Sequence, residues 1–401
     1  MAKKKTKNTI EETIEMPDLG SIISDSLNKQ FKSLGYDVSY RLPSDYIENG
    51  TVPYYIPTGN YALDLAVSNK RYGGLPAGRI IEITGLEQSG KTLLSAHILA
   101  ETQKMGGFAM YIDTEHSFVP EYFGQVCGID FTKNWNHIEI EDLQTIFEII
   151  ESAIMKIRAI DADIPMTIVL DSIMGSSTAD ELSAGYGKDG YATSKSIILS
   201  KAMRKLTNVF GRQNITFIAT NQLRYNVNAN MPGQDKYITS GGKAIDFHSS
   251  VKIRIKRIKT ITITDQYGNK EKVGKTIEAS IIKNRLGPPE KVVKFDIMYQ
   301  SGIDEIQSII DLGLRYKVLS QSGAYYDYKS SNGENIRFQK SKFNEVFTGS
   351  NGLLDELKDS IADRYIMVYS DKKIMDTYND PNIKVEDYDE ESQEEVTSID
   401  D

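Results

Sequence analysis

The sequence lacks the features that mark secreted and membrane proteins. Its 401 residues include one cysteine, Cys127, which excludes an intramolecular disulfide and has no metal-ligand partner nearby, so buried packing is its expected role. No run of about 18 apolar residues occurs. The lysine-rich start, residues 1–7, is followed by no apolar core. We therefore expect an intracellular protein of a reducing compartment, with neither a membrane span nor a secretory signal.

Positive charge is also scarce. The chain has 47 lysines and arginines against 56 aspartates and glutamates, which gives a net charge of −9. This balance argues weakly against nucleic-acid binding over the whole surface, but a local basic surface is enough for such binding. Residues 385–401 contain nine acidic residues and no lysine or arginine, so we expect a disordered, self-repelling tail. Competition with phosphates for a basic groove and simple solubilisation explain this tail equally well.

What the chain does contain is a phosphate-binding loop pattern. Residues 85–92 read Gly-Leu-Glu-Gln-Ser-Gly-Lys-Thr and fit G-x-x-x-x-G-K-[ST] without a mismatch. The apolar run 80–83 precedes the loop, and a helical pattern over 93–105 follows it. In such a loop backbone N–H groups converge on phosphate oxygens, Lys91 reaches the β- and γ-phosphates, and the Thr92 hydroxyl ligates Mg2+. The predicted nucleotide-binding residues of the loop are Gly85, Glu87, Gln88, Ser89, Gly90, Lys91 and Thr92.

Three further apolar runs each end in a polar cluster. Residues 108–112 lead into Asp-Thr-Glu-His, residues 167–170 into Asp-Ser, and residues 216–219 into Thr-Asn-Gln, with helical patterns over 143–157 and 194–210 between them. This order predicts an α/β fold with a mostly parallel sheet and its site at the carboxyl ends of the strands.

Two of the residues at these strand ends are acids with expected roles. Asp171 is the expected second carboxylate at the magnesium, and Glu115 is the candidate that orients or deprotonates the attacking water. A solvated strand-end acid explains either one alone, whereas two on successive strands favour function.

Two stretches lack periodicity. Residues 223–239, directly after Gln222, predict a structureless loop whose order depends on the γ-phosphate. Residues 185–190 contain three glycines with Lys188 and are flanked by tyrosine, a composition that fits a nucleic-acid contact and an ordinary surface loop equally well.

A basic strand and two cations follow. Residues 251–259 alternate basic and apolar side chains, which predicts a half-exposed strand whose basic face is either a solvated surface or a DNA groove. Residues 266–270 predict a hairpin turn into a strand over 275–282. Lys283 and Arg285 come next; they serve either as surface cations or as phosphate-sensing residues supplied to a neighbour's nucleotide.

The chain ends predict smaller elements and complete a division into four parts. Apolar residues at helical spacing over 19–34 predict an amphipathic helix that either folds onto its own domain or docks on a neighbouring subunit. Beyond residue 300 we expect a helix over 306–314, a tyrosine-rich hairpin around 325–328 and a helix over 352–362. The predicted domains are a basic start and docking helix (1–50), an ATPase core (51–300), a small C-terminal α/β domain (301–384) and the acidic tail (385–401).

Taken together, an ordered series of motifs resembles the RecA family of homologous-recombination ATPases. The resemblance extends from about residue 59 to 326 and is closer to the bacterial than to the eukaryotic members, while the divergent termini also fit a phage or plasmid recombinase. The motifs are residues 58–64 (Thr-Gly-Asn-Tyr-Ala-Leu-Asp), 74–79 (Gly-Leu-Pro-Ala-Gly-Arg), the phosphate loop, 112–116 (Ile-Asp-Thr-Glu-His), 170–172 (Leu-Asp-Ser), 202–206 (Ala-Met-Arg-Lys-Leu), 221–222 (Asn-Gln) and 241–244 (Gly-Gly-Lys-Ala).

The resemblance implies a RecA-like P-loop core that binds ATP and Mg2+ between subunits of a helical filament on single-stranded DNA. It implies a DNA-dependent ATPase that pairs this strand with homologous double-stranded DNA in recombination, DNA repair and the SOS response. The implied location is the cytoplasm, or the host cytoplasm for a phage protein, with no membrane contact and with single-strand-binding and mediator proteins as partners.

The resemblance also implies roles for the nucleotide-site residues. Glu115 is the implied catalytic base, Gln222 the γ-phosphate sensor, and Asp171 a magnesium residue alongside Thr92. Tyr122 stacks on adenine and Tyr299 also binds the nucleotide. Lys283 and Arg285 act in trans on the adjacent subunit's ATP; the family usually has lysine at both positions, so Arg285 is a conservative departure.

For DNA, the resemblance places the two binding loops at 185–193 and 223–240. The second loop lacks the family's customary phenylalanine and offers Tyr225 and Met231 instead. Glu278 and Ser280 replace cations of the family's secondary DNA site, which implies weaker or differently arranged capture of duplex. The implied DNA-binding residues are Gly185, Lys188, Gly190, Tyr191, Arg204, Arg224, Tyr225, Met231, Gly241, Gly242, Lys256 and Arg257.

Two other functions remain open on the sequence. A hexameric ring ATPase of the replicative-helicase type shares the core, the loop and the trans cations, and a non-catalytic, ATP-gated DNA-binding filament shares the binding residues. The N-terminal helix ahead of a complete core, the Asp-Thr-Glu-His strand end and the Gly-Gly-Lys-Ala motif favour the recombinase.

Overall fold

A computed structural model describes residues 19–34, 52–183, 192–226, 237–239, 243–349 and 352–367. The chain divides into two compact units, residues 1–53 and 54–401, which we describe separately. In the first unit, α1 (Leu19–Gln30) and a short 3-10 turn (Lys32–Leu34) confirm the predicted helix. Its apolar side chains Ile22, Ile23 and Phe31 are exposed. No helix among the described residues is long and apolar enough to span a membrane.

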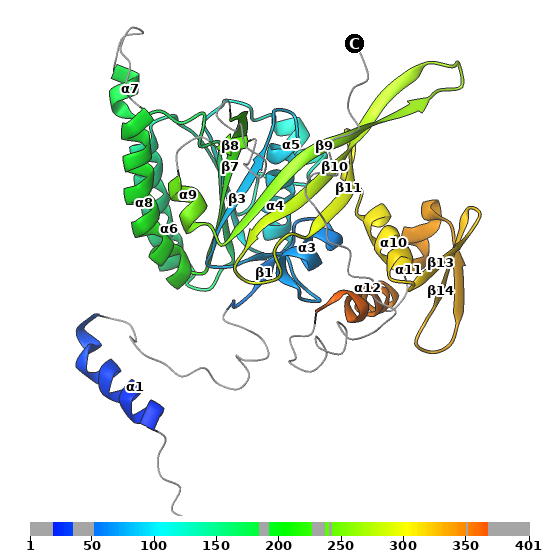
Figure 1. Cartoon of the computed structure of the whole chain (residues 1–401), viewed down its shortest axis with the longest axis horizontal. Helices are drawn as coiled ribbons and strands as arrows, with labels where there is room; N and C mark the ends of the chain where they lie inside the picture. Colours follow the sequence, from blue (N-terminus) through cyan, green and yellow to red (C-terminus); the bar gives the residue numbers. More distant parts are fainter. Residues whose placement is uncertain are drawn as a thin grey trace, which may run out of the picture. The chain divides into compact units, whose positions relative to one another are not determined.

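The second unit is built on one large mixed sheet, which confirms the α/β fold (Figure 1). Its strand order is β12-β11-β10-β9-β3-β7-β6-β4-β5. The parallel part consists of β3 (Ile80–Gly85), β4 (Phe108–Asp113), β5 (Trp135–Glu139), β6 (Met166–Asp171) and β7 (Ile215–Tyr225). β9 (Val251–Thr264) runs parallel to β3 and begins the antiparallel part with β10 (Lys270–Asn284), β11 (Val292–Met298) and β12 (Gly302–Ile303).

Helices cover both faces of the sheet because its strands are apolar on both sides. Figure 1 shows α6 (Leu143–Ile160) and α8 (Ala192–Arg212) together on one face, while α4 (Lys91–Lys104) lies on the other. A hydrophobic core lies on each face of the sheet, and alternate residues of β4 point into one or the other. Met110 and Ile112 pack in the core on the α6/α8 side, and Tyr111 packs in the core on the α4 side. The predicted helices over 93–105, 143–157 and 194–210 are thereby confirmed.

Sequence explains where these helices begin and which side they bury. Asp142 caps α6 by accepting a 2.8 Å hydrogen bond from Thr145 N. The buried residues of α6 recur at helical spacing and are Leu143, Ile146, Phe147, Ile150 and Ile154. Three short helices complete this part: α5 (Pro120–Gln125), α7 (Ala179–Ser183) and α9 (Lys243–His248).

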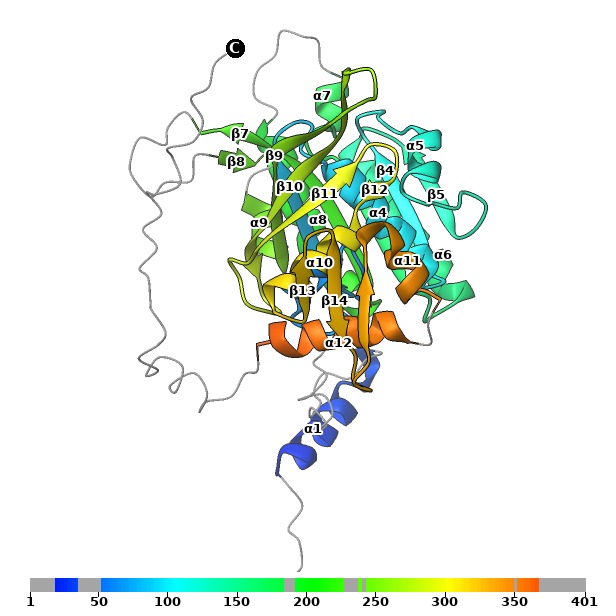
Figure 2. The same cartoon turned by 90° about the vertical axis from the view of Figure 1, so that its right-hand side faces the viewer.

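The C-terminal region contains the expected helices and tyrosine hairpin. α10 (Glu305–Arg315) and α12 (Leu353–Tyr365) flank a sheet of β13 (Leu319–Ser322), β14 (Tyr325–Lys329) and β15 (Asn335–Phe338), with α11 (Phe343–Phe347) beside it (Figure 2). The sequence did not predict β15 or α11. The small elements near the start of this unit are β1 (Tyr55–Ile56), β2 (Leu75–Pro76) and α3 (Tyr61–Ser68).

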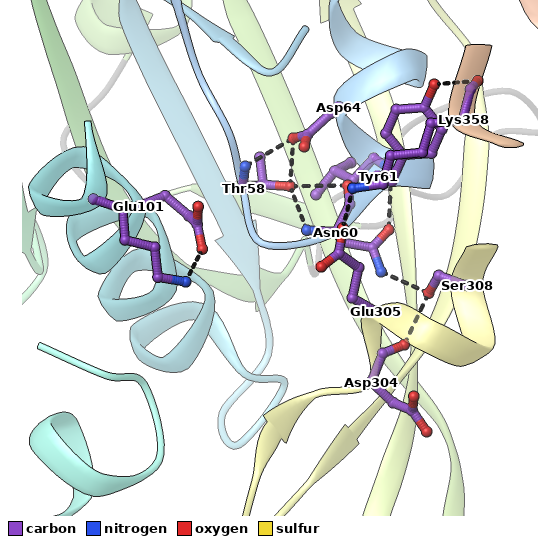
Figure 3. A network of polar contacts seen from close by, with 11 residues as sticks. Thr58, Asn60, Tyr61, Asp64, Glu101, Asp304, Glu305, Ser308 and Lys358 are labelled. Carbon is purple, nitrogen blue, oxygen red and sulfur yellow. Dashed lines mark hydrogen bonds and ion pairs between the residues drawn. The ribbon is translucent and has the colours of Figure 1, made fainter. Parts of the chain in front are cut away.

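Polar contacts join α3 to the C-terminal helices (Figure 3). Asn60 Nδ2 donates to Ser308 Oγ at 2.7 Å, and the Tyr61 hydroxyl donates to Lys358 O at 2.8 Å. Lys358 Nζ in turn lies 3.0 Å from Glu305 Oε1. These contacts tie residues 305–358 to the start of the core, so the motif at 58–64 has a structural task. The predicted boundary at residue 300 stays a prediction.

Two predictions about strands were wrong in part. The loop over 223–239 is shorter than expected, because β7 continues to Tyr225 and β8 (Tyr237–Thr239) pairs antiparallel with it. This pairing places Tyr225 opposite Tyr237, and their rings contact each other at an interplanar angle of 50° with centroids 5.1 Å apart. Lys252 does not lie on an exposed basic face, since it is buried in β9 between carboxylates of Glu82 (3.2 Å) and Asp246 (3.0 Å).

The β9–β10 hairpin confirms the predicted turn. Asp265 Oδ1 accepts hydrogen bonds from the backbone N of Tyr267 and of Asn269, both at 2.8 Å, which closes the turn. Figure 1 shows this hairpin extending beyond the other strands of the sheet. Its outer part is exposed, with Tyr267 at 80%.

Candidate active site

The loop over 85–92 joins β3 to α4 in a tightly closed form. Gly90 has φ +105° and caps α4, and Gln88 has φ +56°. A Cβ on Gly85 would lie 2.4 Å from Ser89 Oγ and 2.6 Å from Ile255 O, so this position requires glycine.

Lys91 supplies positive charge at the loop. Its side chain is buried, and Nζ donates to Gly85 O at 3.2 Å and to Leu86 O at 2.9 Å. Burial lowers the pKa of Lys91, while Asp171, Glu115 and Glu87 oppose that shift. Within the described residues the buried hydroxyl of Ser89 has no hydrogen-bond partner. A cation and an unpaired hydroxyl beside a helix start fit a phosphate group.

Asp171 stands opposite the loop at the end of β6. Its Oδ2 accepts hydrogen bonds from Thr92 Oγ1 at 2.7 Å and from the Tyr111 hydroxyl at 3.0 Å. Its Oδ1 accepts from Thr220 Oγ1 at 2.5 Å. This set places a hydroxyl and a carboxylate side by side next to the loop, as hard oxygen donors suited to Mg2+. The predicted pair Thr92 and Asp171 is thus brought together.

The sequence predicts Thr220 as part of a polar strand end, but it does not predict that Thr220 or Tyr111 contacts Asp171. Tyr111 and Thr220 both lie in buried strands, and burial followed by the charge of Asp171 raises the pKa of the Tyr111 phenol. In the sequence, Tyr111 is a hydroxyl-bearing residue within the apolar run 108–112, and Thr220 is the first polar residue after the run 216–219. Neither pattern says which carboxylate the hydroxyl contacts.

Glu115 follows β4 in a turn organised by Asp113. Asp113 Oδ1 accepts from Glu115 N at 3.0 Å, and Asp113 Oδ2 accepts from Phe118 N at 2.9 Å. The exposed Glu115 carboxylate accepts a hydrogen bond from the Ser172 hydroxyl, directly beside Asp171. The structure thus brings Glu115 to the same sheet edge as Asp171, where its carboxylate is exposed to solvent.

Gln222 lies beside the beginning of the loop. In the parallel register of β3 and β7, Gln222 is the partner of Gly85. Its neighbour Asn221 is buried and donates from Nδ2 to Glu82 Oε1 at 3.0 Å. A residue in this register can sense a ligand on the loop and transmit its presence to the segment that follows β7.

The two tyrosines predicted to bind the nucleotide, Tyr122 and Tyr299, lie near each other. Tyr122 is on α5 and Tyr299 directly follows β11. Burial raises the pKa of Tyr122 to about 12, with smaller contributions from Cys127 and Tyr299. Tyr299 N donates to Val273 O at 2.9 Å, which anchors it to β10. The structure therefore brings both tyrosines to the β10–β11 side of the loop.

Lys283 and Arg285 contact α9. Lys283 Nζ donates to Asp246 O, and an Arg285 guanidinium nitrogen donates to Phe247 O at 2.9 Å. Burial, followed by Arg285, lowers the pKa of Lys283. The pKa of His248 is lowered by burial and then by Arg285, Arg204 and Lys283, so these cations gather at one place. Cations held by backbone carbonyls retain free donors for an anion from outside.

Some predicted DNA-binding residues fall within the described chain. Arg204 is exposed on α8, and Arg224 is exposed with a guanidinium nitrogen 3.6 Å from Met174 Sδ. Tyr225 is 68% exposed at the end of β7. Lys256 and Arg257 are exposed on β9, but as consecutive residues paired with Glu278 and Ile277 they point to opposite faces. The others lie outside the described residues: Gly185, Lys188, Gly190, Tyr191, Met231, Gly241 and Gly242.

Lys275 is a further cation at the loop, and the sequence did not predict it there. Lys275 on β10 donates from Nζ to Gln88 O at 2.8 Å. The sequence predicted a strand there, but no local pattern connects Lys275 with Gln88, from which 187 positions separate it.

Comparison with known proteins assigns this arrangement to a family. The model of the RecA N-terminal domain matches residues 22–304. Protein RecA of Xanthomonas campestris pv. campestris (strain B100) is 35% identical over 306 residues, covering 76% of this chain and 83% of that protein. Protein RecA of Leifsonia xyli subsp. xyli is 36% identical over 275 residues (68% and 71%), and that of Bifidobacterium breve is 31% identical over 354 residues (88% and 84%).

Proposed function

This chain belongs to the RecA family, and we propose that it is an ATP-dependent recombinase that forms a helical filament on single-stranded DNA and catalyses homologous pairing and strand exchange. The observation that carries the proposal is the convergence of Lys91, Thr92 and Asp171 beside the closed loop at 85–92. The relatives named RecA support this function over the ring-helicase interpretation.

The residues around the loop have different roles in ATP hydrolysis. Backbone N–H groups of the loop and Lys91 bind the phosphates, and Gln222 senses the terminal one. Thr92 and Asp171 would hold Mg2+, which supplies positive charge beside the phosphates. Glu115 orients the attacking water and accepts its proton. Tyr122 and Tyr299 hold the base.

Lys283 and Arg285 complete the site of the adjacent subunit. They stabilise the phosphates of that neighbour's ATP, so the filament interface is strong only while the γ-phosphate is present. Hydrolysis removes this contact and loosens the filament. A head-to-tail contact of this kind generates a helix when its rotation does not close a ring, and the proposed filament is this open case.

DNA is held by backbone contacts and stacking, and homology is read by Watson–Crick pairing between strands. Arg204, Arg224 and Tyr225 contribute from the described residues, together with the predicted loops at 185–193 and 223–240. Duplex capture is weaker than usual for the family or differently arranged, because Glu278 and Ser280 are not basic.

The test is ATP-dependent strand exchange between a circular single strand and homologous linear duplex. We expect joint molecules from the wild type and none from Lys91→Ala, while Glu115→Gln retains filaments but loses turnover. Lys104→Ala is a matched control, because Lys104 lies on the same helix and its ammonium is exposed next to Glu101. Electron microscopy with ATP and single-stranded DNA separates a filament from a ring. A wild type that hydrolyses ATP on DNA without joint molecules at any salt would contradict the proposal.

A further inference from the structure

Lys275 reaches the phosphate loop from the antiparallel part of the sheet. Its Nζ lies 2.8 Å from Gln88 O, and its Cε lies 3.8 Å from the position that a Cβ on Gly90 would occupy. An ammonium group has three donors, and the bond to Gln88 uses one of them. The other two remain available next to the loop.

Arg257 reinforces the positive charge at this point. Arg257 pairs with Ile277 across β9 and β10, and Ile277 lies two residues from Lys275, so Arg257 and Lys275 share a face of the ribbon. Ile277 Cδ1 is 3.4 Å from the same Gly90 position, which shows that this face is turned to the loop. Burial, then Arg257 and Lys91, lower the pKa of Lys275. No ion pair to either cation occurs among the described residues.

The position of Lys275 along the site indicates which part of a nucleotide it meets. Lys275 pairs with Ile297, two residues before Tyr299, and Tyr299 N is bonded to the carbonyl of Val273, two residues before Lys275. Lys275 therefore lies between the base-contacting tyrosine and the loop. Lys91, in contrast, interacts with Asp171 and Glu115 on the β6 and β4 side.

We infer that Lys275, supported by Arg257, forms an additional anion subsite for the phosphate group nearest the sugar of the bound nucleotide. This inference rests on the proposed nucleotide binding at residues 85–92. The subsite contributes equally to binding of a nucleoside diphosphate and a triphosphate, because both contain this phosphate. Lys275 therefore affects the affinity for any such nucleotide. Gln222, in the proposed function, distinguishes the triphosphate by sensing the γ-phosphate.

The experiment measures nucleotide binding by the full-length protein with Mg2+ and without DNA. Wild type, Lys275→Met and Lys275→Arg are titrated with ADP, a non-hydrolysable ATP analogue and adenosine by calorimetry. We expect Lys275→Met to bind ADP and the analogue about tenfold more weakly, by the same factor for both, with adenosine unaffected. Lys275→Arg should recover most of the loss, because it restores the charge.

Lys272→Met is the matched control. Lys272 is exposed on the same strand and pairs with Thr262 further along the hairpin, away from the loop. Its replacement should leave all three affinities unchanged. Unchanged ADP affinity in Lys275→Met, a loss confined to the triphosphate analogue, or an equal loss for adenosine would each overturn the inference. Absence of nucleotide binding by the wild type would overturn the proposed function itself.

Discussion

The hydroxyl of Thr92 donates a 2.7 Å hydrogen bond to Oδ2 of Asp171, so the first turn of α4 and the end of β6 meet at one point. The two residues are 79 positions apart, yet they are held together by packing of the helix on the sheet. Further hydroxyls of Tyr111 and Thr220 fix the orientation of the same carboxylate. In the proposed magnesium site, such supporting contacts would fix the orientation of the carboxylate before the metal binds.

The first prediction concerns the charge of Asp171. Asp171→Asn keeps the size of the side chain and one oxygen acceptor for Thr92, but removes the negative charge that attracts Mg2+. We expect the Mg2+ concentration for half-maximal ATPase activity to rise about 10- to 100-fold. Asp163→Asn is the control, because Asp163 is exposed and precedes the amino end of β6, whereas Asp171 is at its carboxyl end. An unchanged Mg2+ dependence in Asp171→Asn would remove Asp171 from the magnesium site.

The second prediction tests whether Lys283 acts on a neighbour. Lys283→Ala retains an intact loop, and Lys91→Ala retains intact trans cations, so each protein alone should lack ATPase activity. In a one-to-one mixture, interfaces that combine the loop of the first with the cations of the second are complete. We expect recovery of roughly a quarter of the wild-type rate, the share for random assembly at a head-to-tail contact. Mixed filaments without recovered activity would show that Lys283 works in its own subunit.

The residues of the phosphate loop could be predicted from the local sequence pattern alone. Lys91 and Thr92 lie within eight residues of Gly85, and their roles depend on a strand–loop–helix order that the hydrophobic period reveals. Asp171 was found because it ends an apolar run, and strand ends meet at one edge of a parallel sheet. The sheet, the major helices and this edge were therefore predictable from sequence.

Other contacts depend on the register of paired strands and on which elements cover a face of the sheet. The hydrophobic repeat of the sequence determines neither. Alternation in β9 placed Lys252 on a basic face, but only the fold shows that Glu82 and Asp246 cover that face. Lys275 meets Gln88 only because of the β9–β10 register, which includes bulges. β8 consists of three residues and is a strand only through its pairing with β7.

The third prediction concerns the tyrosine at the end of β7. Tyr225 is 68% exposed and contacts Tyr237 with the two rings tilted by 50°, so most of its ring is available to a base. Tyr225→Ala should weaken single-stranded DNA binding about tenfold, whereas Tyr225→Phe should bind as the wild type does, because stacking requires only the ring. Fluorescence anisotropy with a labelled oligonucleotide measures both. Tyr267→Ala, at an exposed site on the hairpin tip, is the control. Equal affinities of Tyr225→Ala and wild type would exclude stacking at this residue.

The last prediction concerns Asp64, which is buried in the network of Figure 3. Its Oδ1 accepts from Thr58 N at 2.8 Å and from Thr58 Oγ1 at 2.7 Å. Burial raises the pKa of Asp64 from 3.8 to about 8, although the bonds from Thr58 oppose the shift. The folded protein therefore binds this proton more tightly than the unfolded chain. The stabilisation is fully present below pH 3.8 and is lost as the pH rises through about 8.

Asp64→Asn removes this titration while keeping an oxygen for Thr58. Between pH 5 and 8, the wild type should lose roughly 3–4 kcal/mol of unfolding free energy relative to the variant, as measured by urea denaturation. His97 changes stability in the opposite sense, because burial lowers its pKa from 6.5 to about 4. His97 is present in both proteins, so its effect cancels in the difference. Parallel pH profiles would mean that Asp64 is charged when folded, and that the two donors of Thr58 outweigh the cost of burying its carboxylate.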